Sequence, residues 1–159
     1  MAETLIRIEG SKHEQYLSCI KQVEALIGNE KNLIANLANI TAALKETFGW
    51  FWVGFYLVED KELVLGPFQG PIACSRIAYG QGVCGTAWKR NETLIVPNID
   101  EFPGHIACSA HSKSEIVVPI SKNNTVVAVL DIDSDQFSTF DETDSHHLNS
   151  LCAWLANYF

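Results

Sequence analysis

Three of the five cysteines lie in irregular stretches of the sequence, where a thiol can take part in chemistry. Cys108 lies between His105 and His111, and Cys74 and Cys84 lie ten residues apart in a segment rich in glycine. A loop thiol near potential cations can have a lowered pKa and act as a thiolate nucleophile. For Cys108 alone, an inert loop thiol is an equally good interpretation. Three thiols in two irregular segments favour a relay of reacting cysteines.

The other two cysteines belong to segments with helical periodicity. Cys152 lies on the apolar stripe of the last predicted helix and is expected in the core, and Cys19, on the first helix, is expected to be inert. The total is odd, and the first residues lack the basic segment and apolar core of a signal peptide. This combination argues against a disulfide-stapled secreted scaffold, so we expect a cytoplasmic protein.

Three carboxylates form a second group that could carry chemistry. Asp131 and Asp133 share one face of a predicted strand whose other face is apolar, and Glu115 begins the neighbouring predicted strand. Each carboxylate taken alone is well explained as a solvated strand end, since acidic residues are mostly exposed. If buried, they need a partner or a proton. Together the three favour a polar pocket that binds a cation or holds a proton.

A zinc site is an alternative interpretation of the loop residues. His105, Cys108 and His111 recur at every third position, and Cys84 could add a fourth ligand of a kind that zinc accepts. The spacing is not one of the paired patterns typical of structural zinc sites. We therefore expect neither a metal nor a cofactor.

The elements that must position these groups form an α+β pattern. Asn29 is expected to cap the second helix and Gly49 to end it, and Thr139 and Glu142 have the spacing of a capping box for the last helix. Helices are predicted over 13–27, 29–49 and 83–90 and from about residue 140, and strands over 50–58, 63–66, 94–96, 115–121 and 126–133. This order predicts an antiparallel sheet of about six strands, with the N- and C-terminal helices on one face.

The first predicted strand has two apolar faces, so both must be covered. One face is expected to meet the helices, and the other is expected to floor a ligand pocket roofed by loops. Alternation places Phe51, Val53, Phe55 and Leu57 on one face and Trp50, Trp52, Tyr56 and Val58 on the other, with Trp52 and Tyr56 in the pocket floor.

Length and charge exclude several partners. The 159 residues suit one domain over 1–159, and no apolar run approaches the roughly 18 residues that span a membrane. The net charge is −8 and the 11 Lys and Arg residues are scattered, without the basic stripe that nucleic acid or anionic lipid requires. We expect no nucleic-acid and no membrane partner. The charge does not exclude small neutral or zwitterionic molecules as ligands.

Five ordered segments resemble the free methionine-R-sulfoxide reductases, which are catalytic GAF domains. The likeness covers essentially the whole chain and includes all three cysteines of the irregular stretches. The segments are 66–74 (GPFQGPIAC), 80–87 (GQGVCGTA), 102–108 (FPGHIAC), 114–119 (SEIVVP) and 129–134 (VLDIDS). The resemblance implies a single GAF domain that reduces the R epimer of free L-methionine sulfoxide to methionine.

The resemblance also implies roles for the cysteines. Cys108 matches the cysteine whose thiolate attacks the sulfoxide sulfur and becomes a sulfenic acid. Cys74 matches the main resolving cysteine, which implies a Cys74–Cys108 disulfide that thioredoxin reduces. Cys84 matches a third cysteine with an auxiliary role in recycling or in substrate binding.

The pocket residues match the family in the same way. Glu115, Asp131 and Asp133 match carboxylates that protonate the sulfoxide oxygen and hold the substrate's ammonium group, without a fixed division of the two tasks. Trp52 and Tyr56 match an aromatic box around the methyl group on sulfur. The substrate carboxylate is expected to meet backbone N–H groups of the loops.

Two other functions compete with this one. A noncatalytic GAF sensor would need the pocket but not three thiols, and a zinc-binding regulatory module would carry stoichiometric metal. The sequence does not determine the oligomeric state, and a homodimer is one of the states that it allows.

Overall fold

The structure is a computed structural model that describes residues 4–104 and 110–159. Its helices are α1 (Lys12–Ile27), α2 (Leu33–Phe48), α3 (Gly82–Arg90) and α4 (Glu142–Leu155), and two short 3-10 helices are η1 (Ile99–Glu101) and η2 (Ala156–Tyr158). Its strands are β1 (Trp52–Glu59), β2 (Glu62–Gln69), β3 (Arg76–Ala78), β4 (Leu94–Val96), β5 (Ser114–Lys122) and β6 (Thr125–Ser134).

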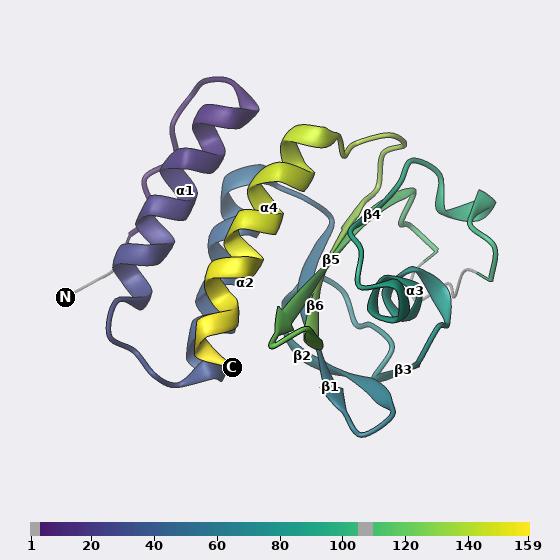
Figure 1. Cartoon of the computed structure of the whole chain (residues 1–159). Coiled ribbons are helices and arrows are strands. Elements are labelled where there is room, and N and C mark those ends of the chain that lie inside the picture. The colour runs from purple at the N-terminus through teal and green to yellow at the C-terminus, as the bar shows by residue number, and fades with distance from the viewer. Residues whose placement is uncertain (1–3, 105–109) are drawn as a thin grey trace.

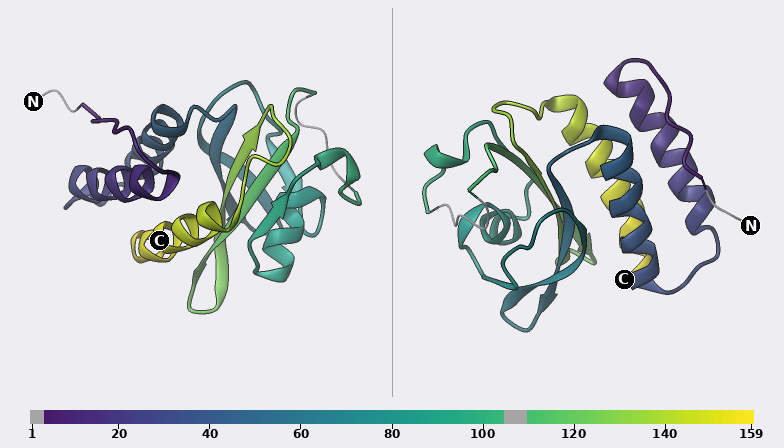
Figure 2. Two further views of the ribbon diagram at one scale, coloured as in Figure 1. Left: turned by 90° about the horizontal axis from the view of Figure 1, so that it is seen from above. Right: turned by 180° about the vertical axis from the view of Figure 1, so that it is seen from behind.

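The strands pair into one antiparallel sheet that separates two sides of the molecule. Its order is β3-β2-β1-β6-β5-β4, so β1 and β6, which are far apart in the sequence, are central neighbours. Helices α1, α2 and α4 lie on one side of the sheet, and α3 with the long connections lies on the other (Figures 1 and 2). This arrangement confirms the predicted α+β fold with the terminal helices on one face.

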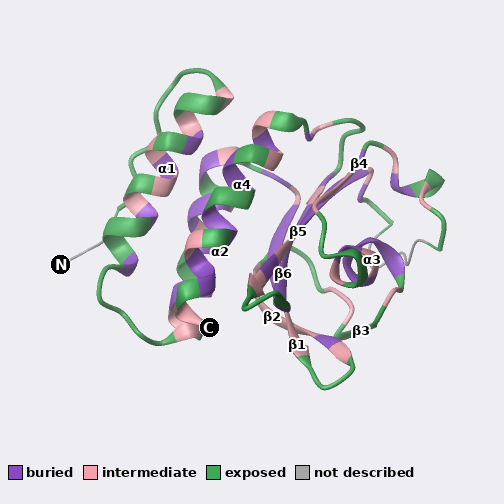
Figure 3. Cartoon of the chain, in the orientation of Figure 1, coloured by how far each residue is buried: buried purple, intermediate pink, exposed green. Residues whose placement is uncertain are grey.

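The larger part of the core lies between the sheet and the helices α2 and α4. Val53 and Phe55 of β1 are fully buried there against Leu37 and Leu44 of α2 and Leu151 of α4. Figure 3 shows the same division: the central strands are largely buried, whereas α1 is exposed along much of its length. No helix in the described residues has an apolar stretch long enough to cross a membrane.

Buried polar groups fix the outer helix α1 against α4. The carboxylate of Asp144 is fully buried and accepts hydrogen bonds from the Tyr16 hydroxyl at 2.8 Å and from the Lys12 ammonium at 2.6 Å. His13 and His147 make a ring-nitrogen contact of 2.8 Å beside them. Because a buried carboxylate requires such partners, these contacts set the position of α1.

The caps of two helices differ from the predicted ones. Asn32, rather than Asn29, caps α2 by accepting a hydrogen bond from the Ala35 amide. Asp141, rather than Thr139, caps α4, and Asp144 instead of Glu142 completes the capping box. The Thr139 hydroxyl instead lies 2.7 Å from the Ser134 hydroxyl, to which it is hydrogen-bonded.

The start of β1 also differs from the prediction. Trp50 packs in the helix-side core and stacks on Phe48 at 4.4 Å between ring centroids, and Phe51 lines the pocket on the other side. Both were predicted on the opposite faces. The strand begins only at Trp52, so alternation does not apply to the two residues before it. From Trp52 onward the predicted faces hold.

Candidate active site

Three neighbouring strands project side chains into one pocket on the side of α3. Trp52 of β1 pairs with Asp133 of β6, which in turn pairs with Glu115 of β5. Because paired residues point to the same face of a sheet, these side chains converge. Two residues along the strands, and so on the same face, Gly54 pairs with Asp131. The sheet register therefore joins aromatic and acidic groups from both halves of the chain.

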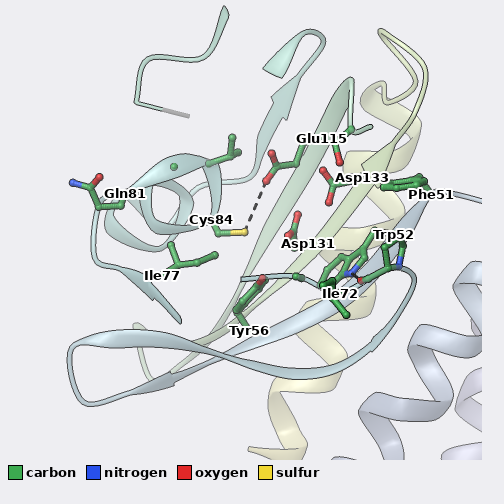
Figure 4. Close-up of a pocket in the computed structure, with 15 residues that line it drawn as sticks. Phe51, Trp52, Tyr56, Ile72, Ile77, Gln81, Cys84, Glu115, Asp131 and Asp133 are labelled. Atoms are coloured by element: carbon green, nitrogen blue, oxygen red, sulfur yellow. Dashed lines mark hydrogen bonds between the residues drawn. The ribbon is translucent and has the colours of Figure 1, made fainter. Parts of the chain in front are cut away.

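The pocket has an aromatic floor, an acidic wall and a rim made by two connections (Figure 4). The lining residues come from β1, the 71–73 segment, β3, α3, β5 and β6 and from positions just before β1, α3 and β5: Phe51, Trp52, Tyr56, Pro71, Ile72, Ala73, Ile77, Gln81, Gly82, Val83, Cys84, Ser112, Glu115, Asp131 and Asp133. Each carboxylate, the two floor aromatics and Cys84 were candidate residues, and the structure brings these six together.

The aromatic floor requires a glycine. Trp52 stacks on Phe68 at 5.4 Å and on Tyr56 at 6.0 Å between ring centroids. A Cβ atom on Gly54 would lie 2.2 Å from the Trp52 ring and 2.6 Å from Phe68. Any larger residue at this position would therefore displace the Trp52 ring or Phe68. Gly54 thus lets the Trp52 ring lie flat across the strand and cover the floor.

The acidic wall is buried. Glu115 and Asp131 are each 6% exposed, and Asp133 is half-buried at the rim. The Cys84 thiol lies 3.8 Å from Glu115 Oε1, and ligand atoms of Cys84, Glu115 and Asp131 all lie within 4.8 Å of one another. Asp131 Oδ1 has no hydrogen-bond partner within the described part of the chain. This wall could hold a cation, either an ammonium group or a metal ion.

Burial makes the wall hold protons more strongly than ordinary carboxylates. Burial raises the pKa of Asp131 to about 6. Hydrogen bonds from Cys84 and Glu115 lower this pKa, but their effect is smaller than that of burial. Burial and the charge of Asp131 raise the pKa values of Glu115 and Asp133 well above the usual range. At neutral pH the wall therefore retains protons that it can donate or exchange for a cation.

We expect Asp131→Asn to stabilise the fold at high pH. A carboxyl with a raised pKa in the folded state costs stability as the pH rises from about 4 through its folded pKa, because the unfolded chain releases the proton earlier. The amide carries no such cost. Urea denaturation at pH 8 should give the variant about 1–3 kcal/mol more stability than wild type, with the difference vanishing near pH 4.

Asp135→Asn is the matched control for this prediction, because Asp135 is an exposed aspartate just beyond the same strand. It should leave the pH dependence of stability as in wild type. A loss of stability in Asp131→Asn at pH 8 would contradict the assignment of Asp131 as a buried acid with a raised pKa.

The cysteines fall into two groups. Cys84 lies in the first turn of α3, is 4% exposed, and has a pKa raised by burial and by the charges of Asp131 and Glu115. Cys74 follows β2 and packs against the cluster of buried residues on the pocket side of the sheet, which includes Trp52 and Tyr56. Cys19 and Cys152 are buried free thiols of the helix-side core, where burial raises their pKa values, as expected of inert cysteines. Cys108, the predicted nucleophile, lies outside the described residues.

The long connection holds residues of the alternative zinc site and one pocket residue that was not predicted from the sequence. His105 and Cys108 of the alternative zinc site also lie outside the described residues, and the His111 ring packs 6.2 Å from that of Phe51. Ser112 was not predicted as a site residue. It is buried, lines the pocket and hydrogen-bonds to Asp133. Its only signal in the sequence was its position just before the strand that carries Glu115.

Comparison with known proteins places this site in a family. The family model described as GAF domain matches residues 32–158. The free methionine-R-sulfoxide reductase of Escherichia coli is 47% identical over 146 residues, covering 91% of this chain and 88% of the relative. The crystal structure of the Neisseria meningitidis free methionine-R-sulfoxide reductase in complex with its substrate superposes with a TM-score of 0.97 at 48% identity, covering 99% of this chain and 96% of that one. The chain belongs to the free methionine-R-sulfoxide reductase family of GAF domains.

Membership of this family makes the protein an oxidoreductase. The GAF domain-containing protein A of Dictyostelium discoideum is 58% identical over 158 residues, covering 99% of this chain and 100% of the relative. Helix α1 lies outside the match to the GAF model but within the superposition on the Neisseria reductase. The helix is therefore part of what this chain shares with that reductase.

Proposed function

We propose that this protein reduces the R epimer of free L-methionine sulfoxide to methionine. The observation that carries the proposal is the pocket itself: an aromatic floor of Trp52 and Tyr56 meets a buried acidic wall of Glu115, Asp131 and Asp133. Relatives and a solved structure that bear the name of this activity match nearly the whole chain.

The two parts of the pocket suit the two ends of this substrate. The unpaired Oδ1 atom of Asp131 lacks a donor, which an ammonium group would supply. The stacked rings of Trp52 and Tyr56 offer an apolar surface for a methyl group on sulfur. A protonated carboxyl of Glu115 or Asp133 is available to donate to the sulfoxide oxygen.

In the proposed reaction, the Cys108 thiolate attacks the sulfoxide sulfur while a wall carboxyl protonates the oxygen. The S–O bond of the substrate breaks and its protonated oxygen passes to the Cys108 sulfur, so that the substrate sulfur gains two electrons and leaves as methionine while Cys108 loses two electrons and becomes a sulfenic acid. Protonation is needed because an oxide is a poor leaving group. Cys84 is proposed to assist within the pocket, where its thiol lies beside Glu115.

Recycling is proposed to proceed through a Cys74–Cys108 disulfide. The Cys74 thiolate attacks the sulfenic sulfur, an S–S bond forms, and the S–O bond breaks with loss of water. A thioredoxin dithiol then reduces this disulfide and is itself oxidised. In support, Cys74 is a disulfide-bonded cysteine, whereas Cys19, Cys84 and Cys152 are free.

A thioredoxin-coupled assay with the separated R and S epimers of free methionine sulfoxide tests the proposal. We expect NADPH consumption with the R epimer, in proportion to the methionine formed, and none above background with the S epimer. Equal rates for the two epimers, or no methionine from either, would overturn the proposed activity.

A further inference from the structure

The segment between β2 and β3 carries Cys74 across the rim of the pocket. Residues 71–75 have no helical or strand structure, and Ile72 is 90% exposed. Pro71, Ile72 and Ala73 nevertheless line the pocket, and Cys74 packs beside it. A segment of this kind has no ladder of backbone hydrogen bonds to hold it, so side chains must contribute to its position.

The pocket floor supplies contacts of this kind. Trp52 Nε1 donates a hydrogen bond to the Pro71 carbonyl at 3.0 Å, and the Tyr56 hydroxyl donates one to the Cys74 carbonyl at 3.0 Å. Just beyond Cys74, the Leu65 amide donates to the Ser75 carbonyl at 3.0 Å. The two aromatic residues that floor the pocket therefore also hold the backbone of the cysteine segment.

Tyr56 is suited to act as a permanent donor. Its side chain is 1% exposed, and burial together with the charge of Asp131 raises the pKa of its hydroxyl. The hydroxyl therefore keeps its proton at any physiological pH. Because its acceptor is the carbonyl of Cys74 itself, the bond restrains the backbone of the residue that carries the sulfur rather than that of a neighbouring residue.

We infer that the Tyr56 hydroxyl is a positioning group for Cys74, with a role separate from that of the Tyr56 ring in the pocket floor. By restricting the backbone of Cys74, it raises the effective concentration of this thiol toward its disulfide partner. The inference rests on the proposed function for the identity of that partner, Cys108. In the recycling step the bond favours attack of Cys74 on the Cys108 sulfenic acid, with release of water.

Tyr56→Phe separates the two roles, because it keeps the ring and removes the donor. Tyr79→Phe is the matched control: it makes the same chemical change on a half-exposed tyrosine that packs on Trp88 and does not line the pocket. The first measurement needs no substrate. Each protein is equilibrated in glutathione redox buffers, and the oxidised fraction of Cys74 is measured by alkylation and peptide mass spectrometry.

We expect Tyr56→Phe to lower the equilibrium constant for disulfide formation by about 2- to 10-fold, the scale that the net contribution of one hydrogen bond sets. Tyr79→Phe should match wild type. In a rapid-quench experiment with substrate, Tyr56→Phe should slow disulfide formation more than methionine release, so that Cys108 sulfenic acid accumulates and reacts with dimedone.

Equal equilibrium constants for Tyr56→Phe and Tyr79→Phe would overturn the inference. A wild-type protein that forms no methionine would overturn the proposed function instead, and the glutathione titration would still test the positioning of Cys74. If Tyr56→Phe fails to fold, Tyr56→Met, which also removes the donor to the Cys74 carbonyl, is titrated in its place, and an unchanged constant there overturns the inference.

Discussion

Cys108→Ser is expected to abolish even the first, stoichiometric release of methionine. A serine hydroxyl is almost fully protonated at neutral pH and is a far weaker nucleophile toward sulfur than a thiolate. Removal of a nucleophile typically lowers the rate by about 10⁴-fold or more. Cys84 cannot replace it, because burial and two neighbouring carboxylates raise the pKa of its thiol and keep it protonated. The measurement is methionine formed per enzyme in a single turnover without reductant.

Cys74→Ser is the matched variant for this experiment. It should release close to one equivalent of methionine in the same single turnover, and then lose most of the steady-state rate with thioredoxin. Indistinguishable single-turnover yields for Cys108→Ser and Cys74→Ser would show that the proposed order of attack and resolution is wrong.

N-acetylation of the substrate is expected to have the second largest effect. The blocked amine keeps a single N–H but carries no positive charge, so it cannot replace an ammonium group beside the Asp131 carboxylate, whose Oδ1 has no hydrogen-bond partner in the described residues. Removing one partner of a buried charged pair leaves the other unpaired, so kcat/KM should fall by about 100-fold or more relative to free methionine sulfoxide. Initial rates with both substrates in the coupled assay measure this ratio.

Asp131→Asn provides the control for this comparison. If the ammonium binds at Asp131, the variant should discriminate much less between the free and the blocked substrate, because its partner charge has been removed. Equal turnover of both substrates by the wild-type enzyme would contradict charge recognition by the acidic wall.

Periodicity in the sequence predicted the parts of the site that lie within single strands. Alternation of apolar and acidic residues placed Asp131 and Asp133 on one face of β6, and alternation along β1 placed Trp52 and Tyr56 together on the pocket face. β4 was predicted with its observed bounds, because it is a short apolar run between Thr93 and Pro97. These features depend only on neighbours in the sequence.

Features that depend on contacts between distant segments were not predictable in this way. The three residues of β3 are too few to show a period, and only Ile77 among them is buried. The 3.8 Å approach of Cys84 to Glu115 depends on how α3 packs on β5. The roles of the cysteines came from the resemblance to a family, since spacing alone left Cys108 as likely to be inert as reactive.

The central pairing of β1 with β6 has a consequence for how the protein is made. Among the strands of this sheet, Trp52 and Tyr56 belong to the first in chain order, and their partners Asp133 and Val129 belong to the last. Closing so long a loop is slow compared with forming a hairpin between adjacent strands. A nascent chain that ends before β6 has the aromatic floor and Glu115 but lacks Asp131 and Asp133, two of the three carboxylates of the acidic wall. A complete pocket therefore forms only after β6 has been synthesised and has paired with β1.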